Sequence, residues 1–289
     1  MKALGRWAFP LLLVFASSIP AAANDGVIEI NQAKALAGAV TPGDMQGFPV
    51  TISRAGSYRL TSNLDVTGLP SPEDITVLHI TASNVTVDLN QFTILGATSC
   101  TGIPVGCIPS SGSGVGIKVE VPAGWATVLN GTIRGMGAAG IDLGQNGRVD
   151  GAVLTQNRVW GINSLANLLV RNCRVTQNGT VGIQAGAFAV IGGNAVQGNG
   201  GYGIDVYSFS SIQGNTVAYN ASSGIHTGAG SVIMDNAIAN NGSFGIEATD
   251  VGVGYGRNTL NGNNSSAAQV GGSPWELGPN VCGGDTACP

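Results

Sequence analysis

Apolar and polar positions along the second half of the chain follow a pattern that returns every 21 residues. Each return is marked by the dipeptide Gly-Ile, whose Gly we expect to form the corner of the coil. Between two such pairs the chain carries an aliphatic residue, an Asn-containing turn, another aliphatic residue and a second Asn. The pairs begin at Gly161, Gly182, Gly203, Gly224 and Gly245. A fixed period of this length predicts a solenoid, in which each repeat forms one coil and packs on its neighbours.

Three columns of apolar residues emerge when the repeats are aligned. The first holds Ile141, Ile162, Ile183, Ile204, Ile225 and Ile246; the second Val128, Val149, Val170, Ile191, Ile212 and Ile233; the third Ile133, Leu154, Val175, Val196, Val217 and Ile238. Nearly all are β-branched, which suits pleated strands. The pattern predicts an all-β fold with three short strands per coil, stacked at ~4.8 Å into three parallel sheets. Because parallel crossovers are almost always right-handed, we expect a right-handed coil.

Asparagines recur at two positions between these strands. One column contains Asn194, Asn215 and Asn236, and the other contains Asn157, Asn178, Asn199, Asn220 and Asn241. Asn tolerates the left-handed backbone of tight corners, and stacked amides can hydrogen-bond from coil to coil. Cys173 occupies the position that Asn194 fills one repeat later. We therefore interpret Cys173 as a small buried thiol in a turn and not as a nucleophile, which would need a His partner.

The parts of the chain outside the clear repeat complete the expected organisation. A basic start, an apolar core and small residues ending at Ala23 predict a signal peptide. The predicted segments are a signal peptide (1–23), an N-terminal cap with a short helix in 29–36 (24–60), the coil (61–264), an insertion loop within it (97–114) and a C-terminal tail (265–289). The cap is expected because the open end of a solenoid exposes core residues and strand edges.

Cysteine usage and charge fit an exported protein. Cys100 and Cys107 bracket a short loop, and Cys282 and Cys288 bracket the last residues, so we expect two local disulfides, although spacing leaves the connectivity open. Formal net charge is -4. An acidic chain without a basic stripe disfavours nucleic acid as a partner. No segment reaches the ~20 apolar residues of a membrane span. We expect a secreted or periplasmic monomer without cofactor or metal.

The repeats resemble a known family. Val170-Arg-Asn-Cys-Arg-Val-Thr-Gln-Asn-Gly-Thr-Val-Gly-Ile183, with its counterparts in later coils, is similar to the right-handed parallel β-helix repeats of pectate-lyase-like proteins. Asn84-Val-Thr-Val-Asp-Leu-Asn-Gln-Phe-Thr-Ile-Leu-Gly96 resembles a first-coil segment of such secreted proteins. The resemblance covers residues 75–265 and implies the fold. It leaves the activity open, because the family includes lyases, hydrolases, epimerases and adhesins.

One outward column is polar throughout. If each Ile of a Gly-Ile pair points inward, the next residue points outward. These residues are Asp142, Asn163, Gln184, Asp205, His226 and Glu247, with Tyr207 two positions beyond Asp205. In pectate-lyase-like enzymes the substrate groove commonly runs along one such sheet, so the resemblance draws attention to this face.

The lower end of the column admits two interpretations. Asp205 and Glu247 could form an acid/base or metal-binding pair with His226 between them as a base. Alternatively, Asp–His–Glu is only a favourable cross-strand order on a solvated face. The resemblance supplies no catalytic set, because the column lacks the Arg of lyases and the paired Asp of polygalacturonases. A groove walled by the 97–114 loop would favour an enzyme, and a flat face would favour binding.

Alternate Gly-Ile pairs are preceded by an aromatic residue: Trp160, Tyr202 and Phe244. Trp160 and Tyr202 are candidates for stacking on sugar rings, although packing over the neighbouring coil is the more common use of such positions. Together these features predict a secreted protein that binds carbohydrate or associates with a cell surface. The alternative is a polysaccharide-active enzyme of lyase, hydrolase or epimerase type that uses Asp205, His226 and Glu247.

Overall fold

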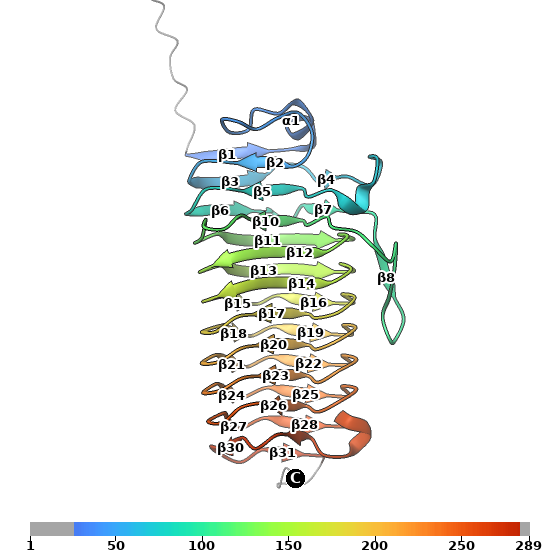
Figure 1. Cartoon of the computed structure of the whole chain (residues 1–289), viewed down its shortest axis with the longest axis vertical. Helices are drawn as coiled ribbons and strands as arrows, with labels where there is room; N and C mark the ends of the chain where they lie inside the picture. The colour runs from blue at the N-terminus through green and yellow to red at the C-terminus, as the bar shows by residue number, and fades with distance from the viewer. Residues whose placement is uncertain (1–25, 284–289) are drawn as a thin grey trace, which may run out of the picture.

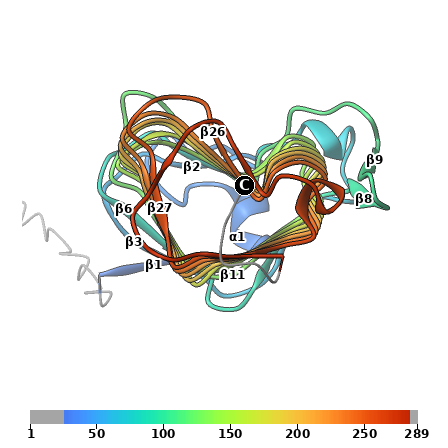
Figure 2. The ribbon, with the colours of Figure 1, turned by 90° about the horizontal axis from the view of Figure 1, so that it is seen from below.

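Strands of consecutive coils lie directly over one another in a computed structural model, which describes residues 26–283 (Figure 1). Equivalent strands pair in parallel, with partners 21 residues apart through most of the tube, as in Ile183 with Ile204 and Ile204 with Ile225. Viewed along the axis, the coils superpose around one narrow core (Figure 2). The predicted parallel solenoid is therefore confirmed.

Sheet B is the ladder formed by the strands that contain the Gly-Ile isoleucines. Its ten strands, in spatial order, are β2 (Val50–Ile52), β5 (Leu78–Ile80), β10 (Ile117–Val119), β12 (Ala139–Gln145), β14 (Trp160–Ala166), β17 (Ile183–Ala185), β20 (Ile204–Val206), β23 (Ile225–Thr227), β26 (Ile246–Ala248) and β29 (Val270–Gly271). All neighbours pair in parallel, so the outward side chains of sheet B form straight columns along the tube.

Sheet A contains the two other predicted ladders. The first ladder consists of β1 (Val27–Ile30), β3 (Gly56–Leu60), β6 (Val85–Asp88), β11 (Thr127–Arg134), β13 (Arg148–Thr155), β15 (Leu169–Arg171), β18 (Val190–Gly192), β21 (Ser211–Gln213), β24 (Val232–Met234), β27 (Gly254–Gly256) and β30 (Trp275–Glu276). The second consists of β4 (Leu64–Asp65), β7 (Thr93–Leu95), β16 (Arg174–Thr176), β19 (Ala195–Gln197), β22 (Thr216–Ala218), β25 (Ala237–Ala239), β28 (Thr259–Asn261) and β31 (Val281–Cys282). Three ladders form two sheets, because β11 and β13 run through the corner and pair in both.

The three predicted apolar columns form the core. Every member of them is fully buried or exposes no more than 1% of its surface. Stacking like on like places β-branched side chains in repeated layers, and buried Tyr58 and Tyr255 join the core outside these repeats.

The N-terminal region before residue 61 contains strands that extend both sheets. β1 and β3 pair with each other, β3 pairs with β6, and β2 pairs with β5. The predicted helix in 29–36 begins later than expected, at Gln32, since pairing with β3 holds Val27–Ile30 as a strand. The helix α1 (Gln32–Ala37) is capped by the side chain of Asn31, which accepts a hydrogen bond from the amide of Lys34. Short 3-10 turns lie at η1 (Pro72–Asp74) and η2 (Asn263–Ser266).

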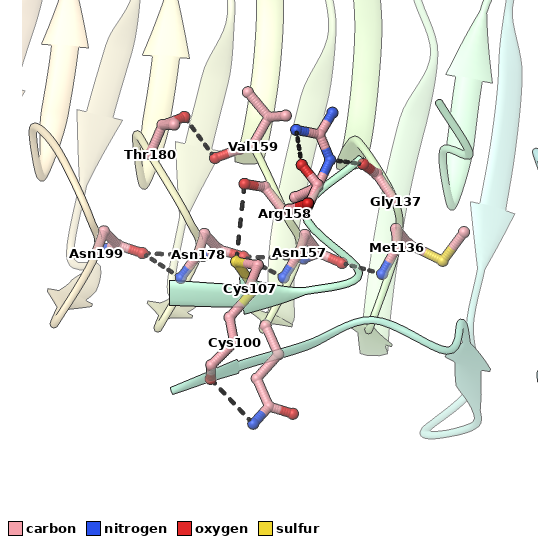
Figure 3. Close-up of a disulfide and its surroundings, with 12 residues drawn as sticks. Cys100, Cys107, Met136, Gly137, Asn157, Arg158, Val159, Asn178, Thr180 and Asn199 are labelled. Carbon is pink, nitrogen blue, oxygen red and sulfur yellow. Dashed lines mark hydrogen bonds between the residues drawn. A yellow bond between two sulfur atoms is a disulfide. The ribbon is translucent and has the colours of Figure 1, made fainter. Parts of the chain in front are cut away.

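The insertion at 97–114 forms a hairpin beside the tube. Its strands β8 (Ser99–Thr101) and β9 (Gly106–Ile108) pair antiparallel and are joined by the predicted Cys100–Cys107 disulfide (Figure 3). The other proposed bridge involves Cys288, which lies outside the described residues, as does the predicted signal peptide through residue 23. Across residues 26–283, no helix has the length and apolarity that crossing a membrane requires.

Both Asn columns form hydrogen-bonded ladders inside the corners. In one, the amide side chain of Asn178 accepts from the backbone and side chain of Asn157 and donates to Asn199 (Figure 3). The left-handed residue of each corner is the one before the ladder Asn: Gln177, with φ 55°, precedes Asn178. The expectation that these ladder Asn residues supply the left-handed backbone is therefore wrong. Their side chains turn inward because each satisfies the buried amide of the coil above.

The glycine of each Gly-Ile pair has a different role from the one expected. We expected Gly to turn the corner, but Gly182 and Gly203 have no left-handed φ. A Cβ on Gly182 would lie 2.6 Å from the carbonyl oxygen of Gly203 and 2.8 Å from the side-chain nitrogen Nδ2 of Asn199. Glycine is required there because the next coil and its Asn ladder pass too close for any side chain.

Candidate functional site

The outward polar column of sheet B has the register that the repeat predicts. Asp142 pairs with Asn163, Asn163 with Gln184, Gln184 with Asp205, Asp205 with His226, and His226 with Glu247. All six side chains are half-buried. Since neighbouring strands lie ~4.8 Å apart, the column presents one hydrogen-bonding group per coil in a straight line.

Asp205 and His226 form the tightest contact of the column. The Nδ1 atom of His226 lies 2.7 Å from Oδ1 of Asp205, and their side chains are 20% and 13% exposed. Glu247 is engaged differently: its Oε2 accepts a hydrogen bond of 2.7 Å from the hydroxyl of Ser223. The structure therefore brings Asp205 and His226 into direct contact and places Glu247 on the adjacent strand, with a separate partner.

Two residues join this cluster from the corner that precedes sheet B. The ring of Tyr202 stacks on the imidazole of His226, with centroids 4.7 Å apart and planes at 18°. Ser223 is fully buried and anchors Glu247. Sequence reasoning listed Tyr202 as one of a periodic set and missed Ser223, whose only signal was a hydroxyl directly before Gly224. Both contacts arise between coils, so they depend on the stacking.

The other aromatic candidates lie apart from the cluster. Trp160 is half-buried at the start of β14, where it pairs with Ala139. Phe244 packs over Gly271, because its ring lies 2.7 Å from the position of a Cβ there. Tyr207 is 60% exposed and points to solvent.

Electrostatics favour a charged imidazole. The hydrogen bond that His226 donates to the Asp205 carboxylate raises the pKa of His226, partial burial opposes this, and the charges of Asp205 and Glu247 add to the rise. Burial raises the pKa of Tyr202, so its phenol stays protonated. A raised pKa favours the protonated imidazole, which donates hydrogen bonds from both ring nitrogens.

Replacing Asp205 by Asn is expected to lower the pKa of His226. The raised pKa in the folded state means that the Asp205–His226 contact stabilises the fold fully below the unfolded His pKa, about 6.5, and less as pH rises through the folded value. The loss of unfolding free energy in Asp205→Asn should therefore be larger at about pH 6 than at about pH 8. NMR titration measures the pKa directly, and His79→Gln assigns the signals, because the chain has 2 His. An unchanged His226 pKa in Asp205→Asn would contradict the assignment.

The column continues toward the N-terminus with basic groups that the sequence pattern had left unassigned. Lys118 pairs with Asp142 and His79 pairs with Lys118. Asp142 accepts a hydrogen bond of 2.8 Å from Asn163, and burial raises the pKa of its carboxyl. Lys118 and His79 line a cavity of about 370 Å³ together with Phe48, Pro49, Asp74, Ile75 and Thr76. Nε2 of His79 lies 3.3 Å from the Glu120 carboxylate.

The disulfide hairpin stands beside the tube (Figure 2). It packs on the corner before sheet B, where the Gln156 side chain donates to the carbonyl of Cys100 and Sγ of Cys107 lies 3.9 Å from the carbonyl of Arg158 (Figure 3). Its tip residue Ile103 lines a cavity with Arg174, Thr176 and Gln177 of the second ladder of sheet A and the following corner. The tip of the hairpin, which we had considered as a wall for a groove over the polar column, therefore contacts the sheet A side of this corner.

Metal binding and a cysteine nucleophile are two further chemistries to test on the described residues. No group of three or more His, Cys, Asp or Glu side chains within residues 26–283 is arranged to hold a metal ion. Cys173 is buried, its amide donates to Asn194, and burial raises the pKa of its thiol to about 11. This agrees with its interpretation as a structural thiol, because a nucleophile would need the thiolate.

Comparisons with solved structures show the same architecture. ORF18 of Geobacillus virus E2 aligns with 80% of this chain at TM-score 0.57 and 13% identity, over 50% of its own length. The Dettilon tailspike protein gp208 aligns with 76% of this chain at TM-score 0.53 and 16% identity, over 55% of its length. The periplasmic alginate epimerase AlgG aligns with 81% at TM-score 0.52 and 14% identity, over 69% of its length. This chain thus spans about half the length of the first two structures.

Sequence comparison identifies the family. A search of curated protein sequences finds no match. The profile of the right-handed β-helix region matches residues 113–274, which is more than half of the chain and includes every coil that carries the polar column. With the parallel ladders and 21-residue coils described above, the chain belongs to the right-handed β-helix family.

Proposed function

We propose that this is an exported glycan-binding protein that holds an extended polysaccharide along the polar column of sheet B. The observation that carries the proposal is the register: hydrogen-bonding side chains occupy successive coils from Lys118 to Glu247 without an apolar interruption. A linear glycan repeats its hydroxyl groups along its length, as this column repeats its partners. One similar structure is named an alginate epimerase, which supports a polysaccharide as the ligand class. The Cys100–Cys107 disulfide supports an oxidising location.

Replacing Asn163 and Gln184 together by Ala is expected to weaken glycan binding at least about fivefold. Each hydrogen bond to a ligand contributes about 0.5–1.5 kcal/mol, so two lost partners suffice. Titration calorimetry of the mature protein with soluble neutral and acidic polysaccharides measures the affinity. Thr216→Ala, an exposed site on the second ladder of sheet A, is the control and should leave binding unchanged. Equal affinity of the double variant and the parent would refute the column as the binding face.

Catalysis is the second candidate, supported by the Asp205–His226 contact. In this case the polysaccharides would yield new reducing ends or unsaturated products, and Asp205→Asn with Glu247→Gln would abolish them. Turnover that survives both substitutions removes these residues from the mechanism. We rank binding first, because the polar column continues over successive coils whereas the Asp205–His226 contact occupies only two of them.

A further inference from the structure

A line of aromatic and amide side chains, all exposed except the half-buried Asn146, runs along the corner between sheet B and the first ladder of sheet A. We call it the corner ridge and define it as Trp125, Asn146, Asn167, Phe188 and Phe209. Each residue lies one coil from the next: the amide of Asn167 bonds to the carbonyl of Ala187, and that of Phe188 bonds to the carbonyl of Ser208. The ridge is distinct from the Asn ladders, whose side chains point into the tube.

The backbone of the ridge is unfavourable for the aromatic residues that occupy it. All five residues are left-handed, with φ between 55° and 63°. Asn and Gly suit this conformation, and the next coils carry Gly230 and Gly252 in it. Trp and Phe have no such preference, and strained residues of this kind gather where a site needs a particular side chain.

Burial does not account for the aromatic choice. Trp125, Phe188 and Phe209 are 62%, 56% and 60% exposed. Phe188 and Phe209 stack on each other, with centroids 5.5 Å apart and planes at 14°. Phe209 also covers Gly230, where a Cβ would lie 2.7 Å from its ring. The rings are thus held in a fixed arrangement while one side of the pair faces solvent.

The surroundings of the ridge suit a sugar chain. Asn167 donates to the side chain of Asn146 at 3.0 Å, so amides separate Trp125 from the phenylalanine pair. Beside Trp125 lies a cavity of about 600 Å³ lined by Thr127, Arg148, Leu169 and the two amides. Rings offer stacking faces to the C–H side of a pyranose, and amides and a guanidinium bond its hydroxyls. Tyr207 connects the ridge to the polar column, since it lies two residues from both Asp205 and Phe209 and is 60% exposed.

We propose that the corner ridge is a second glycan-binding surface, which takes an extended pyranose chain along the tube, with one sugar stacked on Trp125 and the following sugars against the exposed sides of Phe188 and Phe209. The proposal shares with the proposed function only the class of ligand, because none of its five residues belongs to the polar column. The coil rise of ~4.8 Å allows successive sugars to meet successive coils.

Replacing Phe188 and Phe209 together by Asn separates a binding role from a structural one. Asn is the residue of the coil above, at Asn167, and suits the left-handed backbone, so the variant should melt at the same temperature as the parent or higher. Its affinity for the hexasaccharide that the parent binds, among cellohexaose, chitohexaose and hexamannuronate, should fall at least about tenfold, measured by calorimetry. Trp125→Asn should also lower the affinity for this hexasaccharide.

Several outcomes would overturn the ridge proposal. They are unchanged affinity in both variants, a parent that binds none of the three hexasaccharides, or a large fall in melting temperature, which would make the rings structural. A parent that self-associates in sedimentation while the double variant is monomeric would make the ridge a protein interface. The Asn163→Ala, Gln184→Ala variant distinguishes the two sites: binding lost there and kept in the ridge variants supports the column alone.

Discussion

Asn220→Leu should destabilise the protein by about 3–5 kcal/mol. The substitution leaves several buried groups without their partner, and each such donor or acceptor costs about 1–3 kcal/mol. The Oδ1 atom of Asn220 accepts from both the backbone and the side-chain amide of Asn199, at 3.1 and 2.9 Å. Its Nδ2 donates to the carbonyl of Val196 and to Asn241. Leu has a similar size, so the loss would come from these polar groups. Denaturant unfolding followed by circular dichroism measures the change.

Asn261→Ala is the matched control for the ladder variant. Asn261 lies on the same tube but is exposed, so its removal should change stability by less than about 0.5 kcal/mol. Equal effects of the two substitutions would show that the ladder contributes no more than a surface amide. A ladder variant as stable as the parent would contradict the role assigned to the buried amides.

Gly203→Val should prevent folding or destabilise the tube by more than about 4 kcal/mol, a size reserved for severe steric or polar disruption. A Cβ at Gly203 would lie 2.6 Å from the side chain of Val217, 2.7 Å from the side-chain nitrogen Nδ2 of Asn220 and 2.7 Å from the carbonyl oxygen of Gly224. Backbone and ladder atoms cannot move aside without breaking pairing in the next coil. Soluble yield and thermal unfolding report the effect.

Gly198→Asn is the control within the same coil. Gly198 has φ 61° and open space around its Cβ position, and the equivalent residues on neighbouring coils are Gln177, Tyr219 and Asn240. We expect Asn there to be neutral or slightly stabilising, because it suits the conformation and restricts the unfolded chain. If Gly203→Val were tolerated as well as Gly198→Asn, close approach would not be the reason for the Gly-Ile glycine.

The repeat predicts which strands carry the residues of the candidate site, but not which of their side chains touch. A period of 21 residues places Asp205, His226 and Glu247 on adjacent strands, and the register confirms that placement. Which of them touch depends on side-chain rotamers and on the corner before the strand. Glu247 turns to Ser223, and Tyr202 stacks on His226, two contacts that alternation within a strand cannot predict. Their roles in binding or catalysis stay predictions.

The corner ridge shows a second limit of the pattern. In sequence, Phe188 and Phe209 are two apolar residues near a turn, with no sign that they are exposed. Only the backbone conformation reveals that they occupy left-handed positions, where Asn or Gly would be expected, and that their rings stack outside the core. Sequence periodicity describes which residues are equivalent, whereas strain and exposure are properties of the assembled corner.

The sequence by itself determined the coil length, the parallel stacking, the three buried columns and the composition of the polar column. It could do so because one repeat unit carries all the information for the next, and stacking like on like leaves a single consistent register. The tertiary structure alone decided why Gly precedes Ile, which corner residue is left-handed, and where the disulfide hairpin lies. Those features depend on the approach of one coil to another within a few tenths of an ångström, as for Gly182 above Gly203, and no pattern within a single coil carries that distance.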